Sequence, residues 1–73
     1  MGLHRYLVII EKSETGFSAY VPDLPGCIAT GNTRKVVERN LYETVKFHIE
    51  GLKEDGLEVP KPITESEMLV FAA

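Results

Sequence analysis

The chain has 73 residues, of which 44% are hydrophobic and 26% charged, and its formal net charge at pH 7 is −3. This length supports one domain (residues 1–73) with a small core, and the composition excludes a disordered chain. The acidic balance argues against a dedicated nucleic-acid-binding protein. The absence of a long apolar run, of a signal-peptide pattern and of zinc-ligand spacing predicts a cytoplasmic protein without membrane contact, cofactor or metal.

The first half of the chain predicts a β-hairpin. Leu3–Lys12 is a strongly apolar segment typical of a strand, and Ser13–Gly16 has the composition of a hairpin connection. Phe17–Val21 then alternates, with Phe17, Ala19 and Val21 on one face. This alternation predicts a second, antiparallel strand.

A corner rich in proline and glycine follows the hairpin. Pro22 closes the second strand because proline donates no backbone hydrogen bond, and Pro25-Gly26 turns the chain back. Asp23 is expected to bond to the backbone just ahead of it. Cys27–Thr30 is predicted to be a short strand with a buried cysteine.

One long helix and a last strand complete the predicted fold. Thr33 is expected to cap a helix that extends to about Asp55, with Gly56 as its C-terminal cap. Its apolar stripe contains Val37, Leu41, Val45, His48 or Ile49, and Leu52. Met68–Ala72 reads as a short final strand. The predicted class is therefore α+β, in the order β-β-β-α-β, with an antiparallel sheet and one long helix on one face.

The first and last predicted strands are apolar on both faces. Leu7 and Ile9 point one way and Tyr6, Val8 and Ile10 the other, and the last strand shows the same pattern. One helix covers only one face of a sheet, whereas strands apolar on both faces are normally covered on both. We therefore expect a homo-oligomer, most simply a dimer.

The sequence also resembles the N-terminal domain of HicB-type antitoxins, from about Tyr6 to Pro62. The run from Pro22 to Cys27 is the specific part of the resemblance. The matching features are Tyr6 with four apolar residues and Glu11; Gly16-Phe17 and Ala19-Tyr20-Val21; Pro22-Asp23-Leu24-Pro25-Gly26-Cys27; Gly31-Asn32-Thr33; Asn40 and His48; and Glu54-Asp55-Gly56.

The resemblance implies a partial ribonuclease H-like fold and a protein partner. HicB antitoxins sequester HicA, a small basic ribonuclease that cleaves mRNA, so the implied function is neutralisation of a HicA-like toxin by direct binding. Complete antitoxins of this family usually continue into a DNA-binding region. This chain ends at Ala73, so no DNA binding by this chain alone is expected.

Three groups of residues are candidates for binding. Tyr20 and Asp23 are expected to anchor a protein partner, because tyrosine combines apolar area with a polar tip and a rigid corner loses little entropy on binding. A rim of acids would steer a basic partner toward them: Glu54, Asp55 and Glu58. Arg34 and Lys35, in the first turn of the helix, form a candidate anion contact or a tolerated exposed pair.

Two other functions compete with this interpretation. A degenerate metal-dependent nuclease would need converging carboxylates, for which Glu11, Asp23 and Glu43 or Glu50 are the available residues. They are scattered over a strand end, a turn and a helix face, so we expect no enzymatic activity. The other alternative is an oligomeric protein without a toxin partner.

Overall fold

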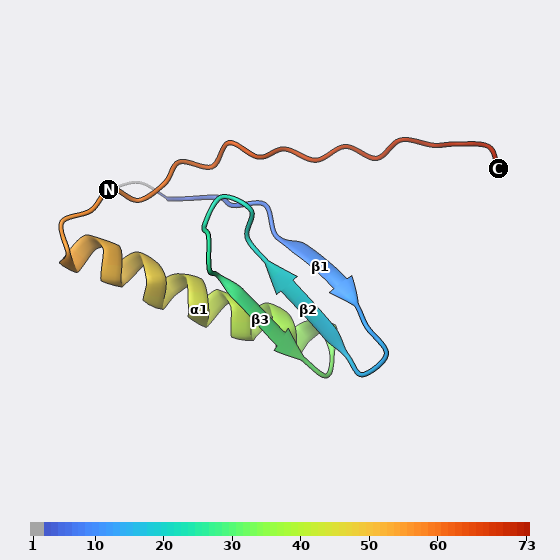
Figure 1. Ribbon diagram of the computed structural model, residues 1–73, viewed down its shortest axis with the longest axis horizontal. Helices are drawn as coiled ribbons and strands as arrows, with labels where there is room; N and C mark the ends of the chain where they lie inside the picture. Colours follow the sequence, from blue (N-terminus) through green and yellow to red (C-terminus); the bar gives the residue numbers. More distant parts are fainter. Residues whose placement is uncertain (1–2) are drawn as a thin grey trace.

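The computed structural model describes residues 3–73 and has one helix packed on one small sheet (Figure 1). Three strands, β1 (Ile9–Lys12), β2 (Phe17–Tyr20) and β3 (Ile28–Gly31), are followed by the helix α1 (Arg34–Glu54). The sheet is antiparallel with the order β1-β2-β3. The predicted α+β class, with three antiparallel strands followed by one long helix, is confirmed.

The core lies between α1 and one face of the sheet. The pairing brings Ile10, Ala19 and Ala29 into one row on this face, because Ile10 lies opposite Ala19 and Ala19 opposite Ala29. The buried hydrophobic residues are Ala19, Val21, Leu24, Cys27, Val37 and Leu41. Since α1 lies against β3 and β2, and none of its Cα atoms comes within 8 Å of one in β1, the β1 side of this layer is left partly open.

The helix begins and ends as its caps predict. The hydroxyl of Thr33 accepts a hydrogen bond from the backbone N–H of Val36 at 3.1 Å. At the other end Gly56 has a φ of 71°, and the N–H of Leu57 donates to the carbonyl of Leu52 at 2.9 Å. This left-handed glycine followed by a bond from the next residue is a Schellman ending, which satisfies the last free carbonyls of the helix.

Gly31 is required by the close approach of the helix to β3. A Cβ atom at this position would lie 2.6 Å from the backbone nitrogen of Val37, in the first turns of α1. The φ of Gly31 is not positive, since the described glycines with positive φ are elsewhere. A hydrogen bond also joins α1 to β3: the side-chain amide of Asn40 donates to the carbonyl of Thr30 at 2.8 Å.

The corner between β2 and β3 differs from its prediction in one respect. Backbone bonds among Val21, Leu24 and Cys27 close the turn, and Leu24 is fully buried in it. The carboxylate of Asp23, however, bonds to residues 63 and 64 rather than to the backbone just ahead of it. The prediction for Asp23 was therefore wrong, because a distant segment supplies better-placed donors.

Two strand predictions were also wrong. The first strand begins at Ile9 rather than Leu3, because β2 ends at Tyr20, opposite Ile9, and offers earlier residues no partner. The predicted strand Met68–Ala72 is absent: after α1 the described chain forms no strand and runs extended past the sheet (Figure 1). The radius of gyration is 14.2 Å, compared with about 11 Å for a compact domain of this length.

Candidate functional site

The open face of the sheet carries a row of apolar side chains around Tyr20. The register places Ile9 opposite Tyr20 and Tyr20 opposite Ile28, so these three side chains lie side by side across all three strands, on the face away from α1. Tyr20 is 39% and Ile28 62% exposed. The next row on this face is polar, with Ser18 between Glu11 and Thr30. A surface with an apolar centre beside polar groups suits protein contact.

Asp23 fastens the C-terminal segment to the corner beside this face. Its Oδ2 accepts hydrogen bonds from the backbone N–H groups of Ile63 and Thr64, both at 3.0 Å, and its Oδ1 accepts one from the Thr64 hydroxyl at 2.6 Å. The side-chain and backbone bonds from Thr64, with that from Ile63, hold the pKa of Asp23 below its usual value. Asp23 therefore shapes the surface and presents few free lone pairs.

Tyr6 makes the second attachment of the same segment. Its hydroxyl donates to the carbonyl of Pro60, and its ring stacks on His4 with centroids 5.9 Å apart. Desolvation by burial, followed by the nearby Asp23 and Cys27, raises the pKa of Tyr6. Together, Tyr6 and Asp23 hold residues 60–64 across the end of the domain.

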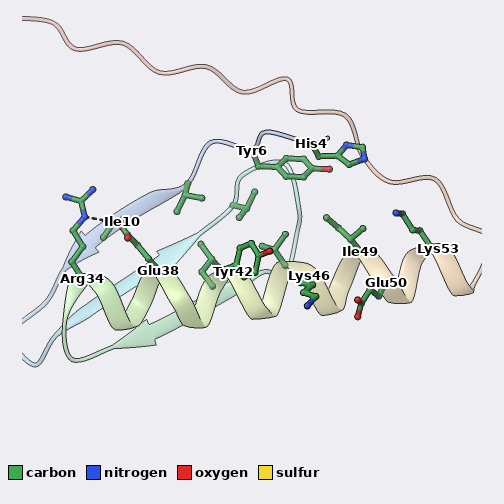
Figure 2. Close-up of a pocket in the computed structure, with 14 residues that line it drawn as sticks. His4, Tyr6, Ile10, Arg34, Glu38, Tyr42, Lys46, Ile49, Glu50 and Lys53 are labelled. Atoms are coloured by element: carbon green, nitrogen blue, oxygen red, sulfur yellow. Dashed lines mark hydrogen bonds and ion pairs between the residues drawn. The ribbon is translucent and has the colours of Figure 1, made fainter. Parts of the chain in front are cut away.

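A groove opens between α1 and the N-terminal segment that leads into β1 (Figure 2). Its volume is about 700 Å³. The apolar lining comes from both sides and contains Tyr6, Val8, Ile10, Leu41, Val45 and Ile49. Exposed charged residues of α1 also line it, namely Arg34, Glu38, Lys46, Glu50 and Lys53. This groove was not predicted from the sequence, because it depends on where the helix crosses the sheet.

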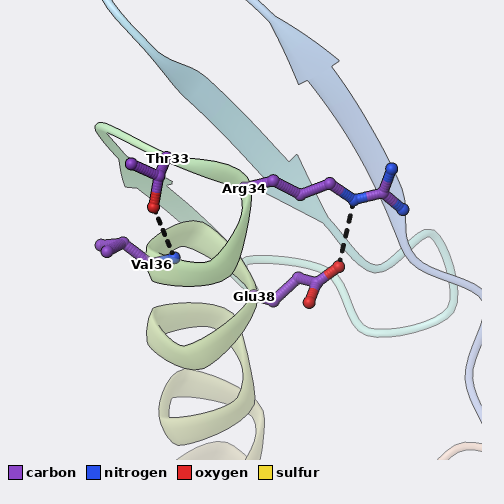
Figure 3. Close-up of polar contacts among 4 residues, drawn as sticks. All are labelled: Thr33, Arg34, Val36 and Glu38. Atoms are coloured by element: carbon purple, nitrogen blue, oxygen red, sulfur yellow. Dashed lines mark hydrogen bonds and ion pairs between the residues drawn. The ribbon is translucent and has the colours of Figure 1, made fainter.

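The two cations at the start of α1 differ in their surroundings. Arg34 donates from Nε to Oε1 of Glu38 at 3.2 Å, one turn further along the helix (Figure 3). This exposed pair offsets part of the unfavourable interaction of Arg34 with the helix dipole. Lys35 is exposed and makes no ion pair or side-chain hydrogen bond with the residues that the structure describes. No described feature marks this turn as an anion site.

The predicted acidic rim lies at the other end of the helix. Glu54, Asp55 and Glu58 are all exposed there. The helix of 21 residues separates them from Arg34 by about 30 Å. The candidate residues are therefore distributed over three places: the open sheet face and corner, the acidic end of α1, and its basic start.

Chemistry-bearing side chains do not gather in the described part of the chain. Among residues 3–73, no group of three or more His, Cys, Asp and Glu side chains is placed to hold a metal ion. Cys27 is buried in the core, and this burial raises the pKa of its thiol. Over the same residues, no helix combines the length and the apolar character needed to cross a membrane.

The fold is a small α+β domain with an exposed apolar row on the open face of its sheet. The sequence matches the family described as "HicB_like antitoxin of bacterial toxin-antitoxin system" over residues 6–70, and the chain belongs to this family. The specific Pro22–Cys27 run, which carried the resemblance in the sequence, forms the corner between β2 and β3, in which Leu24 and Cys27 are buried.

Solved structures support the same relationship. The chain is similar to one from a HicA3 and HicB3 toxin-antitoxin complex, with a TM-score of 0.67 and 37% identity over 82% of this chain and 70% of that one. It is also similar to a crystal structure of the antitoxin HicB3, with a TM-score of 0.69 and 37% identity over 82% of this chain and 44% of that one.

Curated relatives come from a phage, an archaeon and bacteria. An uncharacterised 14.9 kDa protein of Haemophilus phage HP1 is 45% identical over 77% of this chain, which spans 42% of that protein. A UPF0150 protein of Thermoplasma acidophilum is 39% identical over 93% of this chain and 99% of its own length. The chain thus spans less than half of the phage relative and nearly all of the archaeal one.

Proposed function

We propose that this chain is an antitoxin-type protein that binds a HicA-type toxin and thereby neutralises it. The observation that carries this proposal is the similarity, at 37% identity, to a HicB3 chain solved in a toxin-antitoxin complex. The exposed apolar row on the sheet supports it, since such a row is suited to contact with a protein. The chain acts as one domain, by binding rather than by catalysis, in the cytoplasm.

Tyr20 and the Asp23 corner form the centre of the proposed toxin-binding surface. Tyr20 stands between Ile9 and Ile28, so a partner that covers this row removes three apolar side chains from water. Asp23 contributes by bracing the corner through Thr64. Glu54, Asp55 and Glu58 supply negative charge that attracts a basic toxin, whereas Arg34 and Lys35 are assigned no role in toxin binding.

The protein is also proposed to form a homodimer. Large apolar side chains remain exposed on the sheet, on the helix and in the C-terminal segment, including Ile28, Tyr42, Phe47, Ile63 and Phe71. A closed two-fold pair is the commonest way to cover such surface in a small protein. With a net charge of −3, this chain alone is not expected to bind DNA.

A binding assay with a matched variant tests the toxin-binding role. The partner to be tested is the product of any adjacent gene for a small basic protein, and binding is followed by biolayer interferometry. Tyr20→Ala is expected to raise the Kd about tenfold or more, as for an interface anchor. Phe47→Ala, which removes another exposed aromatic side chain from the helix, should leave the Kd unchanged. No complex with the wild-type chain, or equal effects of both variants, would contradict the proposal.

A further inference from the structure

We propose that the C-terminal segment Met68–Phe71 of one copy pairs as a strand with the outer edge of β1 of a second copy, and covers the second copy's groove. The proposal rests on the homodimer proposed above, and specifies how the dimer is built. It is independent of toxin binding. Three features carry it: an open strand edge with an apolar groove, an exposed apolar segment, and acidic residues in the segment against a small excess of basic residues in the groove.

The groove and the edge of β1 form one incomplete part of the fold. β1 is an edge strand, so the backbone groups on its outer side have no partner within the sheet. Beneath it, α1 packs on β2 and β3 and leaves Val8 and Ile10 facing a groove rather than the helix. A strand added to the outer edge of β1 would pair the free backbone groups, and its inward side chains would fill the groove.

The C-terminal segment has the composition and exposure of such a strand. Met68, Leu69, Val70 and Phe71 are between 70% and 97% exposed. Alternate residues of an extended chain share a face, so Met68 and Val70 point to one side and Leu69 and Phe71 to the other. In the proposed pairing Met68 and Val70 enter the groove beside Val8, while Leu69 and Phe71 continue the apolar row of Ile9, Tyr20 and Ile28 on the open face of the sheet.

The direction of the segment favours a second copy over the chain's own edge. Asp23 and Tyr6 hold residues 60–64 at the end of the domain from which β1 starts. Beyond this attachment the segment runs along the outside of the molecule and away from β1, as Figure 1 shows. Its apolar residues therefore project toward solvent, where a two-fold partner can receive them and return its own segment.

Charge complementarity also points to a second copy. The segment carries Glu65 and Glu67 just before its apolar residues. The charged residues that line the groove are three basic ones and two acidic ones, namely Arg34, Lys46, Lys53, Glu38 and Glu50, so the groove has a small excess of positive charge. This excess of positive charge favours the acidic segment of this same chain over a basic toxin. The proposed toxin surface lies on the opposite face of the sheet and stays available in such a dimer.

The first test is the mass of the protein in solution, with variants on both sides of the contact. Light scattering at tens of micromolar should give twice the 8.2 kDa of one chain. Val70→Lys in the segment and Val8→Lys in the groove should each weaken dimerisation by about 100-fold or more, because either buries a charge. Ser66→Ala is the control in the segment and should leave the dimer intact. Circular dichroism must show that the monomeric variants stay folded.

A cross-linking test decides which copy receives the segment. Val8→Cys and Val70→Cys proteins with different isotope labels are mixed and treated with a short bismaleimide. Mass spectrometry should find a linked pair containing one of each. Cys27 is buried, so the wild-type chain should remain unlinked. A double variant with both Val8→Cys and Val70→Cys is treated in the same way. If its two cysteines become linked within one chain while the mixture of single variants stays unlinked, the segment lies on its own β1 and the proposal is overturned.

Two further outcomes would also overturn it. A wild-type monomer at this concentration would exclude both the proposed homodimer and the pairing of Met68–Phe71 with β1 of a second copy. A dimer that survives both lysine substitutions must use another surface. The homodimer would then stand, and the pairing of the segment with β1 would be wrong. Toxin binding is measured separately, so its failure does not bear on either result.

Discussion

Asp23 and Thr64 are joined by two hydrogen bonds, although they lie 41 residues apart in the sequence. The Thr64 hydroxyl donates to Oδ1 of Asp23 at 2.6 Å, and the Thr64 backbone N–H donates to Oδ2 at 3.0 Å. The corner that carries the family's most specific motif thus also holds the C-terminal segment. A residue expected to bond to the backbone of its own turn thus holds a segment about 40 residues further along the chain.

Acid should weaken this attachment. The hydrogen bonds from Thr64 and Ile63 lower the pKa of Asp23 in the folded protein. They therefore stabilise the attached segment fully above the ordinary pKa of aspartate, about 3.9, and this contribution is lost as the pH falls through the lowered value. An NMR titration of the Asp23 carboxyl should give a midpoint below the ordinary value. Thr64→Val should raise that midpoint and Ser66→Ala should not; a midpoint that ignores Thr64→Val would refute the assignment.

Thr33 should contribute measurably to the stability of the helix. Its hydroxyl accepts a hydrogen bond from the otherwise free N–H of Val36, so Thr33→Ala should lower the free energy of unfolding by about 1 kcal/mol.

The Arg34–Glu38 ion pair should contribute less. It is exposed, so Glu38→Gln should lower the free energy of unfolding by only about 0.3–0.5 kcal/mol. Urea denaturation measures both. Thr15→Ala, in the exposed hairpin connection, is the control, and an equal effect there would argue against the cap.

A pair of glycine substitutions should have opposite effects. A side chain at Gly31 would meet the backbone of Val37 at 2.6 Å, so Gly31→Ala should destabilise the protein by about 1–3 kcal/mol. Gly51 lies inside α1 with nothing within 4 Å of an added Cβ. Gly51→Ala should therefore stabilise the helix by about 0.5–1 kcal/mol. Thermal unfolding of the two variants checks both signs, and a neutral Gly31→Ala would show that α1 can move away from β3.

The local elements of this fold could be predicted because their signals are local. The period of Val37, Leu41 and Val45 predicts the buried stripe of α1, and Thr33 and Gly56 mark its ends. The alternation of Phe17 and Ala19 predicts which face of β2 meets the helix. Each of these signals depends on neighbours within a few residues.

The errors concern contacts between distant segments. Met68–Ala72 has the composition of a strand, but a strand forms only where another strand offers its edge, and composition says nothing about where that edge lies. Aspartate is a residue type common in turns, yet the hydrogen-bond donors to Asp23 come from the distant Ile63 and Thr64. The groove arises because α1 crosses β2 and β3 instead of β1. None of these relationships is encoded in a short window of sequence.

Purified protein should not cleave RNA. Glu11 lies on β1 and Asp23 is engaged by Thr64, while Glu43 and Glu50 lie on the helix. Two-metal cleavage needs carboxylates that converge on ions about 4 Å apart. Labelled RNA incubated with the protein and Mg²⁺ or Mn²⁺ should stay intact on a denaturing gel. Cleavage that is abolished by Asp23→Asn would show that the protein is a nuclease.

The acidic end of α1 should govern how fast a basic toxin associates. Glu54, Asp55 and Glu58 are exposed and lie away from the apolar row around Tyr20, so they act through long-range attraction rather than close contact. Replacing all three by lysine should slow association about tenfold or more at low ionic strength. The difference in association rate should shrink at 0.5 M salt, where the screening length is well below the value of about 10 Å at 0.1 M.

Tyr20→Ala should instead speed dissociation at both salt concentrations, because it removes a contact made only in the complex. Stopped-flow association and dissociation rates at two salt concentrations separate the two effects. A triple-lysine variant that associates at the wild-type rate in low salt would remove the acidic rim from the mechanism, while leaving the Tyr20 surface to be judged by its own dissociation rate.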